Sequence, residues 1–136
     1  MDRFVEFINS ANPEIGAEVI APEAEFFAPF GPDPLRGLDG YMHVLETMRS
    51  AFPDIQWKME ESIAEGDSIA VRFTLTGTHR GEFLGVPATG RHVRAAAMNH
   101  YRFSEGKIVE EWGLPDLFGL MTQLRGAQAP GGAPGV

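Results

Sequence analysis

The chain has 136 residues, of which 11 are Lys or Arg and 19 are Asp or Glu, and it contains no cysteine. This length suits one domain, and the lack of cysteine excludes disulfides, a thiolate nucleophile and Cys-ligated metal or iron–sulfur centres. The formal net charge of −8 argues against non-specific binding to nucleic acid, which requires clustered Lys and Arg.

The two ends of the chain show no pattern typical of export or membrane insertion. The N-terminus, Met1-Asp2-Arg3-Phe4, lacks a basic segment followed by an apolar one, and the apolar runs are far shorter than a membrane span. We therefore expect a cytoplasmic protein without a membrane partner. The stretch 126–136, rich in Gly, Ala and Pro, predicts a flexible tail after one domain over 1–125.

Helices are predicted in the first 20 residues. Apolar side chains recur at helical spacing over 4–8 and again over 15–20. Asn12 is the expected N-cap of the second helix, because Pro13 follows it at a position that suits the first helical turn.

A strand and a longer helix follow. The stretch 24–28 predicts a short strand, and the Pro- and Gly-rich stretch 29–34 predicts an irregular loop. The most regular helical pattern has apolar residues at intervals of three, four and seven, with Asp39 as the expected cap and Pro53 as the expected end. Its apolar positions are Tyr41, Val44, Leu45, Met48 and Phe52.

The second half of the chain changes to a period of two, which predicts strands. Apolar residues alternate over 55–63 and 69–75, and long strands are predicted over 92–103 and 107–113. Asp116 is the expected cap of a last short helix. Helices followed by antiparallel strands predict an α+β domain, in which helices cover the concave face of a curved sheet and leave a pocket.

Three stretches of the chain resemble the SnoaL-like branch of the nuclear transport factor 2-like superfamily. They include Ala51-Phe52-Pro53-Asp54, Gly77-Thr78-His79-Arg80-Gly81, Gly85-Val86-Pro87-Ala88-Thr89-Gly90-Arg91 and Glu111-Trp112. The resemblance covers most of the chain and implies a conical barrel, usually dimeric. Ala88 departs from the pattern, which usually has a second Pro there. The functions that the family resemblance implies are aldol cyclisation of polyketides, ketosteroid isomerisation, epoxide hydrolysis and binding without catalysis.

Asp116 is the first candidate for acid/base chemistry. The resemblance implies this role, because SnoaL-like cyclases place a general acid/base shortly after the Trp that corresponds to Trp112. A carboxylate among apolar side chains can take up and return a proton near neutral pH. Capping of the last helix is the structural alternative for Asp116, and the two roles can coexist.

Asp33 and Asn99 form a second candidate pair. Asp33-Pro34 resembles the loop with the general base of ketosteroid isomerases, and Asn99-His100-Tyr101-Arg102-Phe103 resembles their Asp-His-Phe-Arg-Phe strand. The amide of Asn99 is a hydrogen-bond donor at every pH and can stabilise an enolate. The Tyr that these isomerases carry on the first helix is missing. Alternatively, Asp33 is a turn residue and Asn99 bonds to a neighbouring group.

His79 extends the inward-facing row of the strand over 69–75 and is expected at the pocket rim, where an imidazole can shuttle a proton. A structural role is the alternative for His79. The four histidines lack metal-ligand spacing, and the chain has no phosphate loop, dinucleotide fingerprint or nucleophile elbow. We therefore expect neither a metal nor another cofactor.

Large side chains are expected to line the pocket, and the outer sheet face is expected to form a homodimer. The expected pocket walls are Trp112, Tyr41, Trp57, Phe73, Tyr101 and Met59. The expected dimer face comprises Arg72, Thr74, Thr76, His92, Arg94, Met98 and His100. Asn99 shares the more apolar parity of its strand and is expected to point inward.

The sequence favours a cofactor-free acid/base enzyme that acts on a hydrophobic carbonyl compound by cyclisation or isomerisation. In this hypothesis Asp116 moves the proton, Asn99 and His79 hold the oxyanion, and Asp33 is the alternative base. One alternative is a module that binds a small molecule without turnover. Another is a ketosteroid-isomerase-like enzyme that uses Asp33 and Asn99, and an epoxide hydrolase ranks lower.

Overall fold

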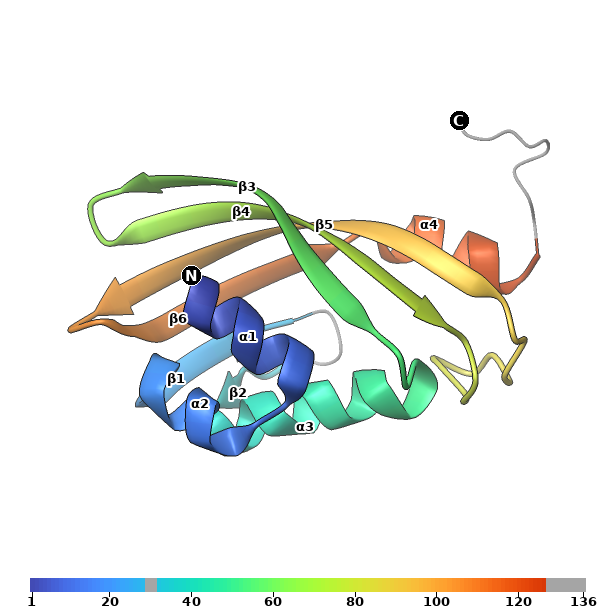
Figure 1. Ribbon diagram of the computed structural model, residues 1–136, viewed down its shortest axis with the longest axis horizontal. Coiled ribbons are helices and arrows are strands. Elements are labelled where there is room, and N and C mark those ends of the chain that lie inside the picture. Colours follow the sequence, from blue (N-terminus) through green and yellow to red (C-terminus); the bar gives the residue numbers. More distant parts are fainter. Residues whose placement is uncertain (29–31, 127–136) are drawn as a thin grey trace.

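The computed structural model describes residues 1–28 and 32–126 of the chain (Figure 1). Part of the expected loop over 29–34 and nearly all of the expected tail over 126–136 lie outside these residues. In chain order the elements are α1 (Asp2–Ser10), α2 (Pro13–Val19), β1 (Ile20–Phe27), β2 (Leu35–Arg36), α3 (Gly37–Ala51), β3 (Gln56–Glu65), β4 (Ser68–Thr78), β5 (His92–Ser104), β6 (Lys107–Pro115) and α4 (Leu117–Leu124).

The described strands form one curved, unclosed sheet in the order β2-β1-β6-β5-β4-β3. Strands β1 and β6 run parallel, whereas the other neighbouring pairs are antiparallel. Helices α1, α2 and α3 lie on the concave side of this sheet (Figure 1). The predicted α+β class is therefore confirmed. None of the helices in the described part of the chain has the length and hydropathy to span a bilayer.

Alternation along β5 shows which side chains face the helices. Val93, Ala95, Ala97 and Tyr101 are buried, while most of the residues between them are exposed. Asn99 is half-buried and belongs to the same inward row, as its parity predicts.

Two strands differ from the sequence prediction. β1 begins at Ile20, directly after α2, rather than at Ala24. Two exposed residues in the middle of β1 interrupt the alternation of buried and exposed side chains, so the sequence pattern does not show that the strand begins at Ile20. β3 has a register shift between Met59 and Glu61, which breaks the expected alternation. Ile63 consequently has 68% of its surface exposed.

Helix α3, which carries part of the candidate site, begins three residues earlier than predicted. Arg36 is its N-cap and Gly37 its first residue, with a φ of 65° that favours glycine. Asp39 therefore lies in the first turn, where its negative charge interacts favourably with the helix dipole. The predicted end before Pro53 is confirmed, since α3 stops at Ala51.

The core consists of two clusters of buried apolar side chains. One joins α1, α2, β1 and the inner sheet face, and it contains Tyr41 and Tyr101. The other joins the end of α3 to β4, β5 and α4, where Leu120 and Leu124 are buried. Gln123 fixes α4 to β5, because its side chain donates to the Arg94 carbonyl at 2.8 Å and accepts from the Arg94 N–H at 3.0 Å.

Candidate functional site

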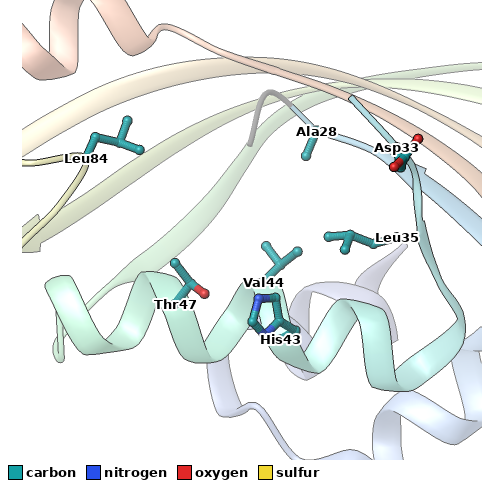
Figure 2. Close-up of a pocket in the computed structure, with 7 residues that line it drawn as sticks. All are labelled: Ala28, Asp33, Leu35, His43, Val44, Thr47 and Leu84. Atoms are coloured by element: carbon teal, nitrogen blue, oxygen red, sulfur yellow. The ribbon is translucent and has the colours of Figure 1, made fainter. Parts of the chain in front are cut away.

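A cavity of about 320 Å³ lies between α3 and the loops that follow β1 and β4. Its described lining is Ala28, Asp33, Leu35, His43, Val44, Thr47 and Leu84. Figure 2 shows the α3 side chains along one side, with Leu84 and Asp33 at opposite ends. A mainly apolar lining with one carboxylate, one imidazole and one hydroxyl suits a hydrophobic ligand that carries a few polar atoms.

A tight turn holds Leu84 at the cavity. Phe83 N–H donates to the Val86 carbonyl at 3.0 Å, and Val86 N–H donates back to the Phe83 carbonyl at 2.9 Å. Leu84 and Gly85 have φ values of 47° and 84°, the left-handed conformations that a two-residue turn of this kind requires. The backbone, rather than packing, therefore places Leu84 opposite α3.

His79 fixes the base of the same loop. Its side chain is fully buried, and its Nδ1 accepts a hydrogen bond from Thr89 N–H at 3.2 Å and lies 2.9 Å from Thr89 Oγ1. The neutral ring therefore carries its hydrogen on Nε2, which has no hydrogen-bond partner in the described part of the chain. His79 thus anchors the loop through Thr89. It is not among the described residues that line the cavity.

A buried polar cluster lies in the first core cluster, where α3, β5 and β6 meet. We define it by Glu111, Asn99, Tyr101 and Tyr41. The amide nitrogen of Asn99 donates to the Tyr101 hydroxyl at 3.1 Å and to Glu111 Oε2 at 3.3 Å, while its oxygen accepts from Leu114 N–H at 3.1 Å. Both N–H groups of the Asn99 amide thus have partners inside the protein. Glu111 is 7% exposed, and its Oε1 has no partner among the described residues.

Burial controls the electrostatics of this cluster. It raises the pKa of Glu111 to about 7, and hydrogen bonding from the Tyr41 and Tyr101 hydroxyls opposes only part of this rise. Burial, followed by the nearby charge of Glu111, also raises the pKa of both phenols well above the ordinary value for tyrosine. Glu111 is therefore the group of the cluster that changes charge near neutral pH.

Comparison with known proteins identifies the family. The family model for SnoaL-like polyketide cyclases matches residues 1–124. The chain belongs to this SnoaL-like family. It is 29% identical over 127 residues to the aklanonic acid methyl ester cyclase DnrD of Streptomyces peucetius, with 90% of this chain and 86% of DnrD covered.

Two solved structures support the same assignment. IdmH from Streptomyces antibioticus is 32% identical, with a TM-score of 0.79 over 91% of this chain and 96% of IdmH. TsrD from Streptomyces laurentii is 27% identical, with a TM-score of 0.80 over 91% of this chain and 90% of TsrD.

Asp116 of this SnoaL-like chain caps α4. Its Oδ1 accepts a hydrogen bond from Gly119 N–H at 2.9 Å, which confirms the predicted cap. The residue is exposed and is not among the described residues that line the cavity. Asp33 is exposed as well, but it lies in the cavity wall.

The expected wall residues lie elsewhere in the described structure. Tyr41, Phe73 and Tyr101 are buried in the first core cluster, and Trp57 and Met59 pack against it.

Trp112 lies on the opposite face from the one expected. It is 49% exposed and stacks on Phe27, with ring centroids 4.1 Å apart and an interplanar angle of 11°. The reason is that neighbouring strand residues alternate between faces, and Glu111 points inward.

Sequence reasoning missed Glu111 and the α3 side chains at the cavity. His43 and Thr47 are four residues apart and therefore share one side of α3, a signal that the sequence does contain. Glu111 pairs with Tyr101 in the sheet register, but a lone acidic residue in a strand is usually solvated. Within residues 1–28 and 32–126, no group of three or more His, Asp or Glu side chains is placed to hold a metal ion.

Proposed function

We propose that the chain is a cofactor-free acid/base enzyme that cyclises or isomerises a hydrophobic carbonyl compound, as a polyketide cyclase does. Membership of the SnoaL-like family and similarity to DnrD support this function. The observation that carries the proposal is the apolar cavity with Asp33 in its wall. A base there meets the ligand among mainly apolar side chains.

In the proposed mechanism Asp33 removes a proton from the carbon next to a ligand carbonyl. The resulting enolate carbon attacks a second carbonyl of the same molecule, which forms a C–C bond and an alkoxide. The alkoxide takes the proton back from the carboxylic acid of Asp33, so the product has the mass of the substrate. The imidazole of His43 and the hydroxyl of Thr47, both in the cavity wall, are suited to stabilise the enolate oxygen.

Asp116 is the second candidate for the base, and Asn99 and His79 are second candidates for holding the oxyanion. Each of these has a partner inside the protein that competes with the ligand: Gly119 N–H for Asp116, Tyr101 and Glu111 for Asn99, and Thr89 for His79. We therefore rank Asp33, His43 and Thr47 ahead of them.

Mass spectrometry of the product tests this function. Aklanonic acid methyl ester and a panel of aromatic polyketides are incubated with the chain in buffer containing a metal chelator. We expect a new product of unchanged mass, because aldol closure and isomerisation conserve all atoms. Addition of one water to an epoxide substrate would instead favour the hydrolase, and saturable binding without any product would favour the binding module.

We also propose that the chain forms a homodimer through the outer sheet face. The support is a row of exposed apolar side chains on β5, β6 and α4: Met98 (59% exposed), Trp112 (49%), Leu114 (70%) and Phe118 (85%). Exposed apolar surface of this kind is typical of protein interfaces.

Sedimentation velocity tests the dimer. We expect the wild-type chain to sediment as a dimer at micromolar concentration and the Leu114→Lys variant to sediment as a monomer, because a buried unpaired charge opposes association. A wild-type monomer over the whole concentration range would contradict the proposal.

A further inference from the structure

Leu84 occupies a backbone position that suits few residue types. It has a φ of 47° and precedes Gly85, whose φ is 84°, so both residues of this tight turn are left-handed. In the left-handed region the Cβ atom of an L-residue lies too close to the following carbonyl oxygen, and only glycine, Asn and Asp adopt it readily. The local backbone therefore disfavours a branched apolar side chain at this position.

The core holds the two ends of this turn but does not include Leu84. Phe83 is buried in the second core cluster, and Val86 packs against that cluster. Leu84 lies between them along the chain, is 52% exposed, and belongs to neither core cluster of the described residues. Packing in the free protein therefore does not explain why a leucine stands at a position that disfavours it.

Among the described residues, Leu84 is the exposed large apolar side chain in the cavity wall. Figure 2 shows it at the end of the cavity opposite Asp33, with Val44 and Thr47 of α3 between them in this view. A ligand that fills the cavity from Asp33 to Leu84 covers apolar surface of Leu84 that is exposed in the free protein, and this burial favours binding. Contact with a ligand thus explains the leucine where packing does not.

We propose that Leu84 is a specificity-determining residue, which binds the apolar end of the substrate while the reacting carbonyl lies at Asp33. The inference rests on the proposed function, which places the ligand in the cavity with Asp33 as the base, and it adds the orientation of the ligand. The substrate class becomes carbonyl compounds with an apolar ring or alkyl group that extends away from the reacting carbonyl. A polar group at that end is disfavoured, because it exchanges water for a side chain that offers no hydrogen bond.

The hairpin between β5 and β6 offers a matched control in the same chain. Its turn residues Glu105 and Gly106 have φ values of 51° and 80°, close to those of Leu84 and Gly85. Both hairpin residues are exposed, and neither is among the described residues that line the cavity. Asn suits the left-handed backbone of either turn. Leu84→Asn and Glu105→Asn therefore make the same backbone change, but only Leu84→Asn alters the cavity.

Nuclear magnetic resonance titration of the protein with two ketones tests this role. 2-Tetralone carries an aromatic ring fused to its cyclic ketone, whereas cyclohexanone has the ketone ring alone. We expect Leu84→Asn to weaken the binding of 2-tetralone roughly tenfold, which corresponds to about 55 Å² of apolar surface that is no longer covered. The affinity for cyclohexanone should stay close to that of the wild type, because a single ring bound at Asp33 does not extend to Leu84.

Further measurements separate ligand binding from folding. Glu105→Asn should leave both affinities unchanged, and Leu84→Met, which keeps an apolar side chain of similar volume, should retain most of the affinity for 2-tetralone. Leu84→Asn should unfold at or above the temperature of the wild type, because Asn tolerates the left-handed backbone better than Leu. Thermal unfolding followed by circular dichroism measures this. A purely structural role of Leu84 predicts instead a clear decrease in the unfolding temperature.

Unchanged affinity of Leu84→Asn for 2-tetralone would overturn the proposal, as would equal weakening of both ketones, a clear loss of stability, or a wild-type chain that binds neither ketone. These outcomes are distinct from failure of the proposed function, because the titration requires no turnover. A chain that cyclises a polyketide equally well with Leu or Asn at position 84 keeps the function and loses this role of Leu84. A chain that shows the expected loss of affinity without any turnover keeps the role and loses the function.

Discussion

Replacing Glu111 by Gln is expected to stabilise the protein at pH 8 and to leave its stability nearly unchanged at pH 4.5. Burial raises the pKa of this carboxyl in the folded state from 4.5 to about 7. In the unfolded chain the carboxyl releases its proton near pH 4.5, whereas in the folded chain it keeps the proton until about pH 7. The folded state thus binds more protons between these values, so the free energy of unfolding decreases as the pH rises.

The size of this effect follows from the shift in pKa. The stabilisation of the folded state by the neutral carboxyl is complete below pH 4.5 and is lost by about pH 7. The free energy of unfolding therefore decreases by about 3 kcal/mol over this range. Urea unfolding of the wild-type chain and of Glu111→Gln at several pH values measures the difference. Glu65→Gln, at an exposed strand end, is the control. Parallel stability curves for the wild type and Glu111→Gln would contradict this account of the buried cluster.

Replacing Asp33 by Asn is expected to lower the rate of product formation by roughly 10² to 10⁴-fold, the usual contribution of a general base. The amide has the size of the carboxylate but cannot accept the proton. Because Asp33 is exposed at the cavity wall, the variant should unfold at the same temperature as the wild type. The measurement is the initial rate of the mass-neutral reaction described above.

The matched control for Asp33→Asn is Asp116→Asn. Asn is as good an N-cap as Asp, so this variant keeps the hydrogen bond to Gly119 N–H and removes only the capacity to act as a base. We expect it to retain a rate close to that of the wild type, whereas Asp116→Ala should lower stability by about 1 kcal/mol through loss of the cap. A fully active Asp33→Asn together with an inactive Asp116→Asn would reverse the assignment of the base.

The sequence predicts the elements well where a strict period meets a clear stop signal. The helix that ends before Pro53 and the inward row of β5 are examples, because one periodicity and one breaker determine each of them. The bulge in β3 was not predictable, since the residues around Met59 continue a regular alternation that the sheet register interrupts. The pairing of β3 with β4, rather than the local sequence pattern, determines on which face of the sheet Ile63 lies.

The candidate site was harder to predict than the fold. A loop resemblance makes Asp33 a candidate, and Asp33 lines a cavity with His43 and Thr47 of α3 and with Leu84, which is remote from it in the sequence. Glu111 was missed because its burial depends on three other elements that cover it, which no local pattern records. The sequence names groups that can do chemistry, whereas tertiary packing decides which of them lose contact with water.

Nuclear magnetic resonance of a bound ketone tests the central claim most directly. 2-Tetralone in D₂O exchanges the protons next to its carbonyl slowly in buffer, and a base in the cavity accelerates this exchange whatever the natural substrate is. We predict that the wild-type chain accelerates the loss of these proton signals and that Asp33→Asn abolishes the acceleration. A wild-type chain that binds the ketone without any faster exchange than buffer would contradict the claim that this cavity carries acid/base chemistry.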